Sequence, residues 1–120
     1  MSGVSEHAHQ VTIFAWAAIM RRKYPELDLL YAVPNGGKRH IGTAKKLKAE
    51  GVRSGVPDIA LPVARGGFHS LFIELKAGKG KPTPNQLLWL HNLSEHNNLA
   101  VVCVGADAAI RQIEAYLEMT

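Results

Sequence analysis

Residues 71–76, with the sequence LFIELK, indicate an interior β-strand that carries two charged side chains. In a strand, residues i and i+2 share a face, so Glu74 and Lys76 project to one side while Leu75 turns into the core. Residues 56–61, VPDIAL, predict a second apolar strand, and this strand contains Asp58. Charges in buried strands are costly unless they are paired or bind a metal. Two such insertions together indicate a functional site.

The residue types at this site suit the metal-dependent hydrolysis of a phosphodiester. Carboxylates such as Asp58 and Glu74 are ligands that Mg²⁺ prefers, and the metal polarises a phosphate and lowers the pKa of a bound water. Lys76 would then meet the attacking water or the charge that develops on the phosphate. The pattern is short, and the alternative interpretation is a turn aspartate beside a solvated strand face.

Four short motifs follow one another along the chain: PNGG at residues 34–37, GVPD at 55–58, ELK at 74–76 and TPNQ at 83–86. Their order and spacing resemble the virus-type replication-repair nuclease (VRR-NUC) family of the PD-(D/E)XK superfamily, and the resemblance spans about 6–116. It implies an α/β, restriction-endonuclease-like fold, with a mixed central sheet flanked by helices, in a single nuclease domain over residues 1–120. It also implies a metal-dependent nuclease acting on DNA, with stand-alone members similar to Holliday-junction resolvases.

The resemblance adds three groups to the expected site. An acid on the first helix, here Glu6, is similar to a third metal-site carboxylate, although the helix dipole favours an acid in a first turn regardless. A glutamine, here Gln86, belongs beside the metal, although Thr83 and Gln86 also fit a capping box. The backbone carbonyl of Leu75 is the third. The expected catalytic residues are Asp58, Glu74, Lys76, Glu6 and Gln86, and the expected ligands of Mg²⁺ or Mn²⁺ are Asp58, Glu74, Leu75 and Glu6.

Basic residues cluster around the two motif carboxylates. The segment 38–81 holds ten Lys and Arg against three acids, a charge of +7, whereas the rest of the chain carries −3 of the total of +4. A basic field that flanks a metal site suits a polyanion, and the alternative is a solvated basic face. The expected DNA-binding residues are Asn35, Lys38, Arg39, His40, Lys45, Lys46, Lys48, Arg53, Lys79 and Lys81.

The apolar periodicity predicts helices at 5–24, 44–50, 83–93 and 107–118, and strands at 28–33, 56–61, 71–76 and 99–104. We expect Ser5 and Thr43 to cap the first two helices, and Gly51 to close the second with a left-handed backbone. The order of elements favours a helix-flanked mixed sheet.

Other classes of protein are disfavoured. One cysteine excludes an internal disulfide, no apolar run reaches the ~20 residues of a membrane span, and no zinc or P-loop spacing is present. We expect a cytoplasmic protein of a bacterial or phage-infected cell.

The sequence therefore predicts a Mg²⁺- or Mn²⁺-dependent endonuclease that cuts branched or otherwise distorted DNA and resembles a Holliday-junction resolvase. We also expect a homodimer, because two coordinated cuts require a two-fold partner. Two alternatives stay open. One is a flap, nicking or single-strand endonuclease of the same fold, and the other is a non-catalytic DNA-binding module of a replisome.

Overall fold

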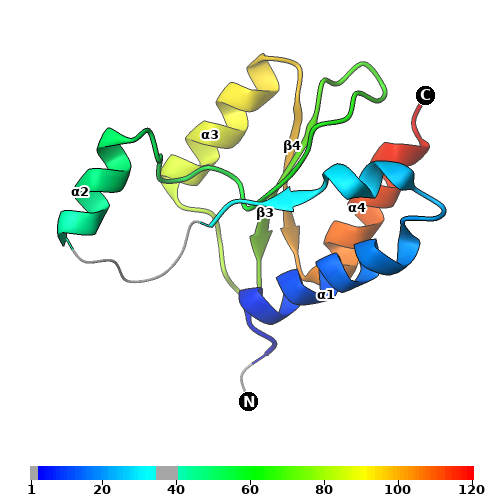
Figure 1. Ribbon diagram of the computed structural model, residues 1–120, viewed down its shortest axis with the longest axis horizontal. Helices are drawn as coiled ribbons and strands as arrows, with labels where there is room; N and C mark the ends of the chain where they lie inside the picture. The colour runs from blue at the N-terminus through cyan, green and yellow to red at the C-terminus, as the bar shows by residue number, and fades with distance from the viewer. Residues whose placement is uncertain (1–2, 35–40) are drawn as a thin grey trace.

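The computed structural model describes residues 3–34 and 41–120 of the chain. A mixed sheet lies between helices, with α1 and α4 on one side and α3 on the other (Figure 1). Helix α2 is set apart from the sheet at the edge of the molecule. In chain order the elements are α1 (Glu6–Met20), the 3-10 helix η1 (Pro25–Leu29), β1 (Tyr31–Ala32), α2 (Ile41–Ala49), β2 (Ile59–Leu61), β3 (Leu71–Lys76), α3 (Pro84–Glu95), β4 (Leu99–Val104) and α4 (Ala106–Glu118).

The four strands lie in the order β1-β2-β3-β4. Strand β2 pairs antiparallel with β1 and with β3, and Ile59 faces Ile73 across the β2–β3 pair. Strand β4 pairs with β3 in parallel, so the chain crosses over through α3, and Glu74 faces Val102. This is the mixed sheet that the sequence predicts.

The core lies between the sheet and the α1–α4 layer. Alternate residues of β3, namely Leu71, Ile73 and Leu75, are almost completely buried and belong to one cluster with Ile13 of α1 and Tyr116 of α4. The intervening residues of β3 project to the other face, which α3 partly covers. The charged residues of LFIELK therefore lie on the α3 side of the sheet.

The chain between α1 and β1 differs from the prediction. Helix α1 has the expected Ser5 cap, which accepts a hydrogen bond from the Ala8 N–H at 3.1 Å, but it ends at Met20. Residues 28–33 are not one strand, because η1 extends to Leu29 and only Tyr31–Ala32 pairs with β2. The first residue of η1 is Pro25, and the fixed φ angle of a proline suits a helical turn.

Helix α2 begins at Ile41, so Thr43 lies within it and the prediction of a Thr43 cap is wrong. Its end is as expected: Gly51 has φ +96°, and the Val52 N–H donates to the Leu47 carbonyl at 2.9 Å. A left-handed glycine with this bond is a Schellman closure. The strand expected at 56–61 pairs only over Ile59–Leu61.

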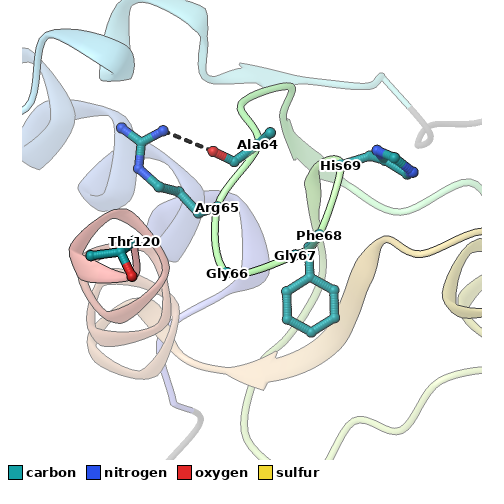
Figure 2. A pocket seen from close by; sticks show the side chains of 7 residues that line it. All are labelled: Ala64, Arg65, Gly66, Gly67, Phe68, His69 and Thr120. Atoms are coloured by element: carbon teal, nitrogen blue, oxygen red, sulfur yellow. Dashed lines mark hydrogen bonds between the residues drawn. The ribbon is translucent and has the colours of Figure 1, made fainter.

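The β2–β3 connection contacts the end of α4. The Gly66 N–H donates to the Thr120 carbonyl at 2.9 Å, and Arg65 forms an ion pair with Glu26. Figure 2 shows an open pocket of about 280 Å³ here, lined by Ala64, Arg65, Gly66, Gly67, Phe68, His69 and Thr120. This pocket lies at the start of β3, whereas Glu74 and Lys76 lie at its end, so it is separate from the candidate site.

Among the described residues, no helix is both long enough and apolar enough to cross a membrane. The single cysteine, Cys103, is buried in β4, and this burial raises the pKa of its thiol to about 11.

Candidate active site

The sheet register brings Asp58 and Glu74 together. Ile59 faces Ile73, so the preceding residue, Asp58, stands opposite the following residue, Glu74, on the α3 side of the sheet. On its other side, the Asp58 carbonyl accepts a hydrogen bond from the Val33 N–H at 2.8 Å. Asp58 is thus fixed between two neighbouring strands at the end of β3.

The Asp58 side chain also continues the pairing between β2 and β3. Its Oδ2 accepts a hydrogen bond from the Leu75 N–H at 2.8 Å. The N–H and the carbonyl of one residue in a strand point to the same edge, so the Leu75 carbonyl is directed to the edge where Asp58 lies. The predicted carbonyl ligand and the Asp58 carboxylate therefore share one side of β3.

Glu74 is buried with an incomplete set of partners. It is 1% exposed, and its Oε2 lies 3.4 Å from Lys76 Nζ, which belongs to a residue 7% exposed. The other oxygen, Oε1, is buried and has no hydrogen-bond partner among the described residues. A buried carboxylate oxygen without a donor is strongly unfavourable unless a cation or a proton occupies it.

The electrostatics of Glu74 and Asp58 favour a positive charge beside the two carboxylates. The pKa of Glu74 is raised from its usual 4.5 to about 8: burial is the largest cause, the neighbouring Asp58 carboxylate adds to the rise, and Lys76 offsets part of it. Two carboxylates that share a buried site repel each other, and a divalent cation between them removes that repulsion. The donor set of two carboxylates and a carbonyl fits a hard cation such as Mg²⁺.

The described residues contain no group of three or more His, Cys, Asp or Glu side chains that could hold a metal ion. The two carboxylates that the sheet register brings together are those of Asp58 and Glu74. This number agrees with magnesium sites that use one or two carboxylates and complete the octahedron with water and substrate phosphate.

Glu6, the predicted third acid, is exposed in the first turn of α1. It lies seven residues before the fully buried Ile13 and so shares its helix face. The start of α1 is held near the end of β3, because His9 Nδ1 accepts from the Ala106 N–H at 3.0 Å and the Gly105 N–H donates to the Lys76 carbonyl at 2.9 Å. The role of Glu6 stays a prediction.

Gln86 has the capping role that was the alternative to a catalytic one. Its Oε1 accepts from the Thr83 N–H at 2.8 Å, and its own N–H donates to Thr83 Oγ1 at 3.2 Å. Both bonds of a capping box are present, so the Gln86 side chain fixes the start of α3. Its catalytic role stays a prediction.

The described basic residues predicted to bind DNA are all exposed. Helix α2 carries three of them and joins Asp58 through residues 50–57 (Figure 1). These residues are Lys45, Lys46 and Lys48 on α2, Arg53 after it, and Lys79 and Lys81 after β3. The other predicted DNA-binding residues, Asn35, Lys38, Arg39 and His40, lie outside the described residues.

Asn85 and Trp89 form contacts that the sequence does not reveal. Both side chains donate to the carbonyl of Ser54, at 2.9 Å from Asn85 Nδ2 and 3.0 Å from Trp89 Nε1. Ser54 precedes Asp58 by four residues, so α3 holds the segment that leads into the site. Asn85 lies within the TPNQ motif, which is the only signal in the sequence that singles it out.

The fold and the site define a class of protein: an α/β chain with two adjacent carboxylates and a lysine at the end of a central strand. The model of the VRR-NUC domain matches residues 6–107, and the chain belongs to this family. A solved structure titled "VRR_NUC domain protein" is similar over 99% of this chain and 93% of its own, with 31% sequence identity and a TM-score of 0.85. No curated protein matches the chain.

Family membership and fold agree with the expectations from the sequence. The VRR-NUC domain is a nuclease domain of the PD-(D/E)XK type, so the chain is a nuclease.

Proposed function

We propose that this nuclease is a Mg²⁺- or Mn²⁺-dependent endodeoxyribonuclease that hydrolyses phosphodiester bonds of branched DNA, with activity similar to that of a Holliday-junction resolvase. The observation that carries the proposal is the buried Oε1 of Glu74, which has no partner among the described residues and lies beside a second carboxylate. Its neighbour Lys76 supplies only one positive charge to two acids.

The cation would be held by the carboxylates of Asp58 and Glu74 and by the Leu75 carbonyl, with Glu6 as the predicted fourth group. When bound, a divalent cation polarises a phosphate and lowers the pKa of a coordinated water. The Leu75 N–H, which donates to Asp58 at 2.8 Å, orients the Asp58 carboxylate and restricts its rotation. The two acids thus meet a cation with little reorganisation.

Lys76 would act on the substrate. Its ammonium has three donors, and the Glu74 carboxylate at 3.4 Å directs it toward the site. A lysine in this place orients the attacking water and stabilises the negative charge that develops on the phosphate. Water competes poorly for these interactions, because both Glu74 and Lys76 are buried.

Exposed lysines on α2 and after β3 support contact with the DNA backbone. Lys45 and Lys46 are exposed on α2, and Lys79 is exposed three residues after Lys76, so exposed basic residues precede Asp58 and follow Glu74 along the chain. Phosphate contacts carry no sequence information directly. Recognition of a branched or distorted shape fits such a surface better than recognition of a base sequence.

Cleavage of a four-way junction requires two cuts on strands of opposite polarity. One chain carries one Asp58 and Glu74 pair. We therefore propose a homodimer with two opposed sites, because a two-fold axis presents identical sites to the two strands.

Burial of Glu74 beside Asp58 destabilises the folded chain. A protein that only binds phosphate would gain nothing from this arrangement, which argues against a purely DNA-binding role. The flap, nicking and single-strand activities use the same residues and differ only in the substrate. Labelled four-way, flap, nicked, duplex and single-stranded DNAs, each incubated with Mg²⁺ or Mn²⁺, separate these activities. Symmetric paired cuts in the four-way junction support the proposal, and cleavage of flaps with intact junctions withdraws the resolvase assignment.

A further inference from the structure

We propose that Asn85 and Trp89 are positioning residues for cleavage: they fix Asp58 and Arg53 relative to each other, so that the DNA backbone held at α2 is presented to the carboxylates. We call the contacts of these two side chains with Ser54 the Ser54 clamp. The inference rests on the proposed function, and it assigns a role to residues that do not touch the reacting groups.

The Ser54 clamp saturates one backbone carbonyl. Asn85 Nδ2 and Trp89 Nε1 donate to it at 2.9 Å and 3.0 Å, and Asn85 Nδ2 also lies 3.0 Å from Ser54 Oγ. A carbonyl oxygen has two lone pairs, so both are used. Two donors from successive turns of one helix fix the direction of the carbonyl as well as its position.

Gly55 shows how closely the chain approaches α3. Its φ is +87°, and a Cβ built on it would lie 2.6 Å from Asn85 Nδ2 and 3.0 Å from Trp89 Cδ1. A side chain at residue 55 would therefore strain the backbone and displace the Asn85 and Trp89 side chains or the segment itself. The helix surface is itself fixed, because the Thr83 and Gln86 capping box forms the first turn of α3.

The Ser54 clamp lies between two groups with different tasks. On one side, the Arg53 guanidinium lies 5.9 Å from the centre of the Trp89 ring, a cation–π contact that orients a predicted DNA-binding residue. On the other side, the buried Pro57 leads directly into Asp58. The Trp89 indole therefore contacts Arg53 through its ring, and through its N–H it holds the segment that leads to Asp58.

This arrangement predicts a selective loss when the clamp is broken. A shift of the segment moves Asp58 relative to Glu74 and the bound phosphate, and a misplacement of about 1 Å can reduce a rate by roughly a hundredfold. The lysines on α2 still contact DNA. Cleavage and metal binding should therefore weaken while DNA affinity is kept, whereas a merely structural role would weaken all three together.

Two variants remove the donors and keep the shapes. Asn85→Leu has a similar branched side chain without an N–H, and Trp89→Phe keeps a ring for Arg53 without the indole N–H. Asn92→Leu is the matched control, because it makes the same change at an exposed asparagine of α3 outside the Ser54 clamp. Three quantities are measured for each chain: the single-turnover cleavage rate, the Kd for DNA without metal, and the Kd for Mn²⁺ by calorimetry on the metal-free protein.

We expect Asn85→Leu and Trp89→Phe to cut at least about tenfold more slowly and to bind Mn²⁺ several-fold more weakly, with a DNA Kd within about threefold of the original. Asn92→Leu should behave as the original chain does. Unchanged Mn²⁺ binding in both variants would overturn the inference, and so would an equal loss of DNA affinity and cleavage. If the original chain cuts no DNA, the proposed function fails, but weaker Mn²⁺ binding by Asn85→Leu than by Asn92→Leu still supports the clamp.

Discussion

The Asp58 carboxylate accepts a hydrogen bond from the Leu75 N–H at 2.8 Å, so a side chain takes the place of a main-chain partner where β2 has stopped pairing with β3. This bond places Asp58 beside Glu74, whose Oε1 is buried without a partner among the described residues. The relationship accounts for the main features of the site, because it brings two acids together at the end of a buried strand.

Glu74 should make the stability of the metal-free protein depend on pH. Its pKa of about 8 in the folded chain lies above the usual 4.5, so between these values the folded state binds more protons than the unfolded state. The free energy of unfolding should therefore fall as the pH rises from about 4.5 through about 8, and Glu74→Gln should remove most of this fall. Thermal melts of both chains in chelator at pH 5.5 and 8.5 measure this dependence of stability on pH.

The matched control for that experiment is Glu95→Gln, which changes an exposed carboxylate on α3. At pH 8.5 we expect Glu74→Gln to melt at least roughly 5 °C above the original chain. The Glu95→Gln control should melt at the same temperature as the original chain. Equal pH profiles for the Glu74→Gln variant and the original chain would show that Glu74 is not a strained acid.

Divalent cations should stabilise the protein through the same two acids. A ligand that binds only the folded state raises the melting temperature, and here it also relieves the repulsion between Asp58 and Glu74. We expect Mg²⁺ and Mn²⁺ to raise the melting temperature of the original chain and to leave that of Asp58→Asn almost unchanged. A comparable rise in both chains would place the cation elsewhere.

Lys76 should be needed for turnover and not for metal binding. We expect Lys76→Met, which keeps most of the buried stem, to lose cleavage by several orders of magnitude and to retain a calorimetric Mn²⁺ site. Lys23→Met changes an exposed lysine outside the predicted DNA-binding residues and serves as the control, with cleavage close to the original rate. Absence of the Mn²⁺ site in Lys76→Met would contradict the separate roles of the lysine and the acids.

The exposed lysines of α2 should contribute to affinity without sequence preference. We expect Lys45→Glu with Lys46→Glu to weaken binding to all DNA sequences about equally and to reduce the slope of log K against log salt by roughly 0.9 for each lost phosphate contact. Arg111→Glu alters an exposed arginine of α4, on the other side of the sheet, and should keep the slope. A wild-type slope in the double variant would remove α2 from the DNA surface.

The sequence predicts those parts of the fold that depend on local patterns. The alternation in LFIELK places Glu74 and Lys76 on one face, Gly51 closes α2, and Thr83 caps α3, all as expected. The strand expected at 28–33 is wrong because Leu27 and Leu30 are both buried at a spacing of three, which suits a helical turn that begins at a proline.

The site is predictable only in part, for a physical reason. The sequence places Asp58 and Glu74 on neighbouring strands, but alternation fixes only the face of each residue, and the register that sets Asp58 opposite Glu74 comes from the structure. Hydrogen bonds to a main-chain carbonyl leave no pattern in the sequence, because every residue has such a carbonyl. The contacts of Asn85 and Trp89 with Ser54 therefore become visible only in the structure.

The most direct test of the central claim is cleavage of a labelled four-way junction by the original chain and by Asp58→Asn, in Mg²⁺, in Mn²⁺ and in chelator, with the cut positions mapped on a sequencing gel. The account predicts paired, symmetric cuts by the original chain in the presence of either metal, no cuts in chelator, and a loss of several orders of magnitude in Asp58→Asn, whose DNA affinity is kept or increased. Cuts of similar rate by both chains, or cuts that persist in chelator, would contradict it.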